Sequence, residues 1–164
     1  PRDYCPLSQL AERYRELLRI SHEVGVTATF EYVSFFKSAY SLAQAWEVVQ
    51  KCAEQGGTLI LDSFHNFNSR TTLEQLQAVP VERISHYHLS DGSRDKPAGQ
   101  QIDADRVMPG DGAADLAAEV RLLRSKGYDG SVSLELFNID LWEQPPLEVA
   151  KQGLDRLKAL FADG

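Results

Sequence analysis

Four side chains with metal-binding chemistry stand near the ends of separate apolar segments of the chain. They are Glu31, Asp62, His88 and Glu135. Side chains alternate along a strand, so a strand that carries one of them has a polar and an apolar face, and we expect all four to point to the same side. Three carboxylates that converge there would repel one another, and a divalent cation removes that repulsion. The oxygen and nitrogen set suits Mn²⁺, Mg²⁺ or Co²⁺, with Zn²⁺ as a further candidate.

Each of these residues also has a structural interpretation when it is taken alone. A carboxylate at a strand end is usually solvated or caps the next element, and His88 could be a hydrogen-bonded core histidine. Glu135 stands between Leu134 and Leu136, where a buried carboxylate needs a partner. The coincidence of all four residues favours one metal site.

Alternating helical and strand patterns supply the elements that must position these residues. Helices are predicted at residues 8–22, 41–55, 72–79, 113–127 and 146–161. Strands are predicted at residues 24–35, 58–64, 83–91 and 130–137. A long polar loop is expected from Asp91 to Gly112. This alternation predicts an α/β fold with a parallel sheet and right-handed crossovers.

Composition limits the partners that are expected. The 164 residues include 17 Lys and Arg against 24 Asp and Glu, a formal charge of −7, and the basic residues are scattered. Nucleic acid is therefore not expected as a partner. Cys5 and Cys52 form neither a disulfide framework nor a paired metal motif, which predicts a reducing, cytoplasmic setting. No apolar run reaches transmembrane length, so no membrane partner is expected.

Two further features receive structural interpretations. The PGDG sequence at 109–112 precedes a predicted helix, as in a phosphate-binding loop, but no Lys-Ser or Lys-Thr pair follows it. A plain turn and helix entry is the preferred interpretation. His22 lies at a helix end, and His86 lies deeper than His88 on the same strand face, where it can support a ligand without contacting the metal.

The chain resembles the xylose isomerase-like barrels, a family that includes sugar phosphate isomerases/epimerases and ketose 3-epimerases. The resemblance rests on LDSFH at 61–65, HYHLSD at 86–91, MPGDG at 108–112 and YDGSVSLELF at 128–137. It covers residues 24–161 and corresponds to the second half of the family's barrel, strands five to eight. The implied fold is a TIM (β/α)₈ barrel of this type. Residues 1–164 would form about four βα units, the C-terminal half of a single barrel domain.

Half of a parallel barrel would leave two strand edges unpaired. The N-terminal half is therefore expected from missing sequence or from another chain, and a homo-oligomer is compatible with the sequence.

The resemblance implies roles for individual residues. Glu31, Asp62, His88 and Glu135 match the metal ligands of the family. His65, in the LDSFH motif, matches a residue that contacts substrate oxygens. Arg94 stands where the ketose epimerases have a substrate-binding arginine, and Arg106 is the alternative. Relatives that cleave DNA at abasic sites keep an Asp-x-His pair where this chain has Ala104 and Arg106, so an endonuclease activity is disfavoured.

The implied reaction is isomerisation or epimerisation of a ketose or related polyol. A divalent metal can bind the oxygens of a small-molecule sugar substrate, and Glu31 and Glu135 can then act as general base and general acid through an enediolate. A dehydratase that acts on a keto-inositol or a dehydroshikimate-like acid is the alternative within the family. His88 favours the isomerase, because some dehydratases have glutamine there. A non-catalytic sugar-binding barrel is a third interpretation, which the retention of four ligands disfavours.

Overall fold

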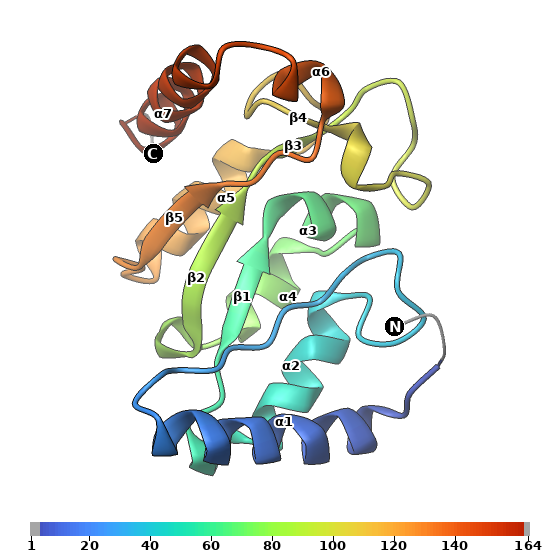
Figure 1. The fold of residues 1–164 in the computed structure, drawn as a ribbon, viewed down its shortest axis with the longest axis vertical. Coiled ribbons are helices and arrows are strands. Elements are labelled where there is room, and N and C mark those ends of the chain that lie inside the picture. Colours follow the sequence, from blue (N-terminus) through green and yellow to red (C-terminus); the bar gives the residue numbers. More distant parts are fainter. Residues whose placement is uncertain (1–3, 163–164) are drawn as a thin grey trace.

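The computed structural model describes residues 4–162 as one layer of parallel strands packed against helices (Figure 1). The strands are β1 (Leu59–Asp62), β2 (Ile84–Leu89), β3 (Asp91–Gly92), β4 (Arg106–Val107) and β5 (Ser131–Leu134). The helices are α1 (Leu7–Glu23), α2 (Leu42–Gln50), α3 (Ser63–Ser69), α4 (Leu73–Ala78), α5 (Leu116–Ser125), α6 (Ile139–Trp142) and α7 (Pro146–Ala162). None of these described helices is long and apolar enough to cross a lipid bilayer.

Three of the strands form a parallel sheet in the order β1-β2-β5. Its register pairs Asp62 with His88, and His88 with Ser133. The carboxyl ends of the three strands therefore share one rim, and residues near that rim are brought close together although they are far apart in the sequence.

The prediction of a strand over residues 24–35 is wrong. The segment makes a single parallel bridge, between Phe30 and Leu59. Phe30 donates to the carbonyl of Thr58 and accepts from the amide of Ile60, after which the chain turns and Val33 donates to the carbonyl of Ala39. Apolar alternation predicted a strand, but a ladder also needs a partner along its length. Among the described residues, β1 is the only strand that pairs with this segment, and it does so along one edge.

Side-chain alternation separates the two faces of the sheet as predicted. Leu59 and Leu61 of β1 and Tyr87 and Leu89 of β2 are fully buried in the core, against α2, α4 and α5. In Figure 1 these helices lie behind the sheet. Burying each such side chain contributes on the order of 1.5–3 kcal/mol. On the opposite face, Ile60, His86 and His88 remain partly accessible, whereas Asp62 is fully buried.

The predicted loop from Asp91 to Gly112 has more structure than expected. β3 pairs with β4 in antiparallel orientation, and the side chain of Asp91, the first residue of β3, is buried. The Asp91 carboxylate accepts hydrogen bonds from the amides of Gly92, Gly110 and Ala114, at 2.9, 3.1 and 2.9 Å. The loop amides are thus bound to an internal anion, which supports the interpretation of PGDG as a turn rather than a phosphate cradle.

Candidate metal centre

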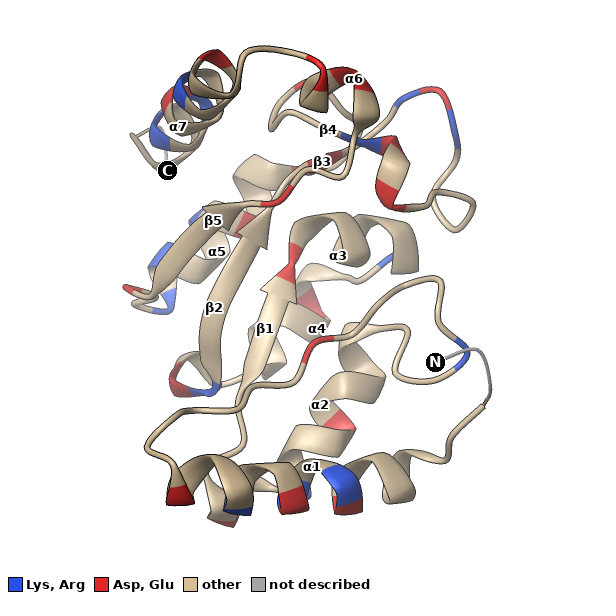
Figure 2. Cartoon of the chain, viewed as in Figure 1, with Lys and Arg blue, Asp and Glu red and all other residues tan. Residues whose placement is uncertain are grey.

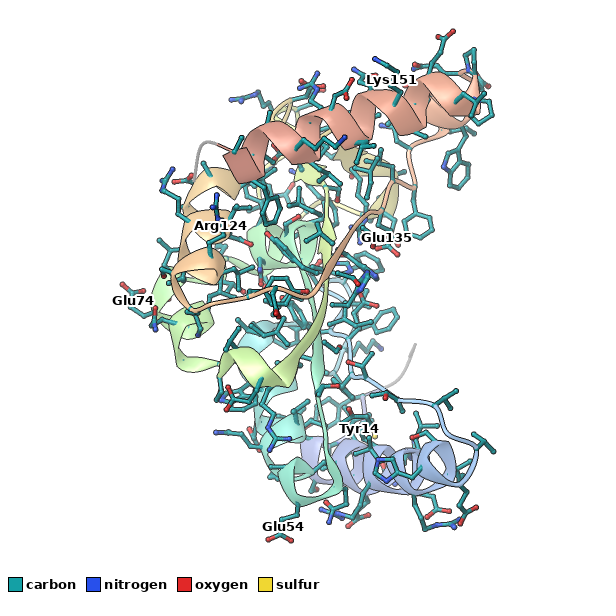
Figure 3. The ribbon with its side chains drawn as sticks, turned by 90° about the vertical axis from the view of Figure 1, so that its left-hand side faces the viewer. Tyr14, Glu54, Glu74, Arg124, Glu135 and Lys151 are labelled. Atoms are coloured by element: carbon teal, nitrogen blue, oxygen red, sulfur yellow. The ribbon has the colours of Figure 1, made fainter. Side chains whose placement is uncertain are left out.

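The four predicted ligands meet at the carboxyl rim of the sheet. Each offers one ligand atom, and these atoms all lie within 4.8 Å of one another. Figure 2 shows acidic positions at the ends of β1 and β5 and on the segment beside β1. Figure 3 shows Glu135 on the open side of the sheet, opposite the helices that carry Glu74 and Arg124. The members of this cluster, called the ligand cluster below, are Glu31, Asp62, His88 and Glu135.

His88 lies at the centre of the ligand cluster. Its Nδ1 atom is 3.1 Å from Glu31 Oε1, 3.4 Å from Glu135 Oε2 and 4.0 Å from Asp62 Oδ2. Hydrogen bonds to Glu135 and Glu31 raise the pKa of His88 to about 10. The protonated imidazole therefore supplies a positive charge to the carboxylates in the metal-free protein.

The spacing of the ligand atoms fits a divalent ion. Two ligands on opposite sides of an ion at about 2.1 Å lie about 4.2 Å apart. The cluster span of 4.8 Å is only slightly wider, and Glu31 and Glu135 have flexible side chains that are partly exposed. Three carboxylates with one imidazole are a donor set that Mn²⁺, Mg²⁺, Co²⁺ and Zn²⁺ accept.

The local sequence explains why Asp62 is rigid. It ends β1 and is the N-cap of α3, where its Oδ1 atom accepts the amide of His65 at 2.9 Å. Ser, Thr, Asp and Asn are favoured at this position because a side-chain oxygen can satisfy a free amide of the first turn. Burial raises the pKa of Asp62, while His65 and Arg106 oppose that effect. One oxygen of Asp62 thus fixes the helix, and the other faces the ligand cluster.

Arg106 is a member of the site that the sequence identified only as an alternative to Arg94. It is 1% exposed, and Nη1 donates to Asp62 Oδ2 at 2.8 Å, while Nη2 lies 3.4 Å from Glu135 Oε2. Its guanidinium lies over the ring of Phe64, 4.5 Å from the centroid, and near that of Phe137. Arg94 is exposed and donates to a loop carbonyl away from the ligand cluster.

His65 contacts Arg106 beside the ligand cluster. Arg106 Nη2 donates to His65 Nε2 at 3.2 Å. On the other side of the ring, Nδ1 accepts from the amide of Ser34 at 3.3 Å and lies 3.0 Å from the hydroxyl of the same residue. Asn68 donates to the same hydroxyl at 2.8 Å. Burial lowers the pKa of His65, so the ring is neutral at pH 7. Ser34 and Asn68 carried no sequence signal, because their role depends on how the loops fold together.

His86 lies two residues before His88 on the same face of β2. Its Nε2 atom is 2.9 Å from the hydroxyl of Ser133 on β5, and its ring packs edge-on against the His88 ring at 5.1 Å. The hydrogen-bond partner of His86 is the neutral hydroxyl of Ser133 and not a carboxylate of the ligand cluster. His86 therefore contacts the cluster by packing its ring against that of His88. His22, the other histidine given a structural interpretation, is exposed in the last turn of α1.

Comparisons with known proteins find related sequences and structures. A family model described as xylose isomerase-like TIM barrel matches residues 6–160. The inosose isomerase of Halalkalibacterium halodurans is 31% identical over 141 residues, which are 85% of this chain and 50% of that protein. The 3-dehydroshikimate dehydratase of Pseudomonas aeruginosa is 28% identical over 151 residues, or 90% of this chain and 24% of that protein.

A solved structure matches almost the whole chain. The IOLI protein with a binding zinc atom has a TM-score of 0.90 at 27% identity, over 98% of this chain and 59% of the other. The chain thus spans about half the length of the curated isomerases that it matches.

Proposed function

The chain belongs to the xylose isomerase-like TIM barrel family, and from this premise we propose that it is the metal-binding half of a sugar isomerase or epimerase. The observation that carries the proposal is the convergence of Glu31, Asp62, His88 and Glu135 within 4.8 Å at one rim. The curated relatives reported above are named as an inosose isomerase and a 3-dehydroshikimate dehydratase. The substrate proposed for this chain is a ketose or a cyclic polyol that carries a ketone.

We assign the metal to the ligand cluster. When bound, a divalent ion would polarise a substrate carbonyl and lower the barrier to removal of a proton from the adjacent carbon. Glu31 and Glu135 approach His88 from two different elements, with Oε atoms 3.1 and 3.4 Å from its Nδ1. One of the two carboxylates removes the proton and the other returns it, which gives isomerisation or epimerisation.

His65 and Arg106 are proposed to bind substrate oxygens. Arg106 already places its planar guanidinium against Asp62 and Glu135, and its fork can donate to two oxygens at once. His65 presents Nε2 as an acceptor to Arg106. A substrate hydroxyl that donates to Nε2 would take the place of the Arg106 donor. The proposal therefore assigns to Arg106 the role expected of Arg94.

The site is proposed to be completed by further βα units. Residues 1–164 would be the C-terminal half of one barrel domain, equivalent to strands five to eight. In that arrangement the edge at Phe30 and the edge of β5 would each pair with a strand from the other half, supplied by the same chain or by another. Closure would also remove the ligand cluster from bulk water, which strengthens its electrostatic interactions.

Inosose is the first substrate to test, because the inosose isomerases match this chain at 31% identity. A dehydratase that uses the same proton abstraction is the second candidate, since dehydroshikimate dehydratases match at 28% and 25%. The greater identity to the isomerases places isomerisation first.

Solvent deuterium incorporation tests the proposal. The intact protein, loaded with Mn²⁺ and incubated with inosose in D₂O, is expected to place deuterium on the carbon next to the ketone, as followed by NMR. Glu135→Gln should lower turnover by about 10²–10⁴, the range for loss of a positioned acid or base. The exposed Glu143→Gln is the control and should turn over normally. An unsaturated product that absorbs in the ultraviolet would show a dehydratase, and no exchange with inosose or any ketose tested would contradict both candidates.

A further inference from the structure

Glu119 is a half-buried carboxylate that the proposed reaction does not use. It lies in the first turn of α5, on the helix side of the sheet, and its neighbours Leu116, Val120 and Leu123 are core residues. Its Oε2 atom accepts two hydrogen bonds, from the hydroxyl of Tyr87 at 2.9 Å and from Nδ2 of Asn66 at 3.0 Å.

The hydrogen bonds extend from Asn66 to a third segment. Asn66 Oδ1 accepts the hydroxyl of Tyr32, 2.5 Å away. Tyr32, Asn66 and Tyr87 are all at most 1% exposed. Glu119 therefore joins β2, α3 and the segment beside β1 through one continuous network, which we call the outer network.

The three members of the outer network other than Glu119 are each the immediate chain neighbour of a site residue. Tyr32 follows Glu31, Asn66 follows His65, and Tyr87 precedes His88. In the extended pairs Glu31–Tyr32 and Tyr87–His88, adjacent side chains point to opposite faces, and Asn66 and His65 are adjacent in the first turns of α3. A residue anchored on the outer face therefore fixes the backbone from which its neighbour reaches into the ligand cluster.

We propose that Glu119 is a positioning residue that holds three site-bearing segments in the geometry required for metal binding. The inference deepens the proposed function, since it rests on the assignment of the ligand cluster as a metal site. Glu119 would touch neither metal nor substrate. Its effect would pass through Tyr87 to His88, and through Asn66 and Tyr32 to His65 and Glu31.

Two features of the position of Glu119 partly offset the cost of burying its charged form. The free amides at the start of α5 carry a partial positive charge that favours a carboxylate in the first turn. Hydrogen bonds to a charged acceptor are also stronger than those between neutral groups. The carboxylate lines an outer pocket of about 350 Å³ with Arg70 and Asp115, so it keeps some contact with water.

Substitutions at Glu119 separate positioning from packing. Glu119→Met keeps the length of the side chain but has no acceptor, whereas Glu119→Gln keeps one oxygen that can accept from both Tyr87 and Asn66. In the intact protein, we expect Glu119→Met to weaken Mn²⁺ binding about tenfold, the lower end of the range for outer partners of metal ligands. Glu119→Gln should bind within about threefold of wild type. Affinity is measured by competition with a chromophoric chelator.

Hydrogen exchange of the metal-free protein provides a second measurement that does not depend on the metal. Glu119→Met should speed amide exchange in the segment beside β1, at the start of α3 and in β2. Glu74→Met is the matched control, because Glu74 is an exposed glutamate in the first turn of α4 and should leave both measurements unchanged. Tyr87→Phe removes only the hydroxyl donor and should also weaken Mn²⁺ binding. This variant provides the test if Glu119→Met does not fold.

The outcomes separate the two proposals. Wild-type protein that binds no Mn²⁺ would contradict the proposed metal site. The hydrogen-exchange data would still show whether Glu119 holds the three segments in place. Unchanged exchange in Glu119→Met and Tyr87→Phe would overturn the role of Glu119. Faster exchange with wild-type Mn²⁺ affinity would also overturn it, because Glu119 would then stabilise the fold without positioning the ligands.

Discussion

At the scale of single residues, the ligand cluster is an anionic site with two built-in positive groups. His88 and Arg106 lie among Glu31, Asp62 and Glu135, and hydrogen bonds of His88 lower the pKa of Glu135. His88 and Arg106 differ in whether they can become metal ligands. His88 can lose its proton and become a ligand, whereas an arginine remains charged at any physiological pH. Arg106 is therefore a permanent partner of Asp62.

Arg106→Met should destabilise the metal-free protein. The change leaves Asp62, which is fully buried, without its charged partner, and such losses cost about 3–5 kcal/mol. A bound divalent ion would supply positive charge to the same carboxylate, so Mn²⁺ should restore part of the loss. Thermal unfolding with and without Mn²⁺ measures both effects. Arg94→Met, at an exposed loop position, should change neither value, and an Arg106→Met protein as stable as wild type would contradict the buried ion pair.

Glu119 should make stability depend on pH. Burial raises its pKa to about 7 from 4.5, against the hydrogen bonds of Asn66 and Tyr87, and Asp62 and Asp115 add to the increase. A raised carboxyl pKa means that its contribution is complete below pH 4.5 and is lost as pH rises through 7. Glu119→Gln cannot ionise, so it should be more stable than wild type at pH 8, by on the order of 1–2 kcal/mol, and equal at pH 4.5.

Urea unfolding at the two pH values measures this difference. Glu74→Gln is the control, because hydrogen bonding to Thr72 lowers the pKa of the exposed Glu74, and it should give no gain at pH 8. A Glu119→Gln protein that is less stable than wild type at pH 8 would show that the charged form is favoured in the folded protein.

At the scale of elements, helical periodicity predicted α1, α5 and α7 to within three residues at each end. The helix predicted over 41–55 ends earlier, at Gln50. Ser41, Thr72 and Asp115 accept amides at the starts of α2, α4 and α5. The expected strand over 58–64 ends instead at Asp62, because the cap of Asp62 begins α3 at Ser63. The strand over 24–35 failed for the different reason that pairing is a property of two segments, and the sequence of one cannot supply it.

Gly112 should be sensitive to any side chain. A Cβ atom there would lie 2.2 Å from both Asp91 Oδ1 and the carbonyl of Gly92, and that carbonyl is backbone that cannot rotate away. Gly112→Ala must therefore displace the turn or β3, with a cost of about 1–3 kcal/mol. Because β3 pairs with β4, which begins at Arg106, metal affinity should fall as well.

Urea unfolding and a Mn²⁺ titration test this prediction, with the exposed Ala113→Ser as the neighbouring control. Wild-type stability in Gly112→Ala would show that the turn adapts without loss.

At the scale of the whole molecule, the sequence predicted which four side chains converge better than it predicted the sheet. The ligand cluster followed from strand alternation at Asp62, His88 and Glu135, which depends only on local geometry and on the parallel order of the strands. Arg106 was harder to place, because it reaches the cluster through a loop whose path depends on Asp91 and on β3 pairing with β4. The outer network could not be predicted from the sequence, because its residues stand at ordinary core and helix positions.

Metal content of the intact protein tests the central claim most directly. Wild type dialysed against Mn²⁺ and then buffer is expected to retain about one ion per chain by elemental analysis. His88→Ala removes the central ligand and should retain almost none, whereas Glu74→Ala, at an exposed position in α4, should retain the wild-type amount. Equal metal content in wild type and His88→Ala, or none in either, would contradict the assignment of Glu31, Asp62, His88 and Glu135 as one metal site.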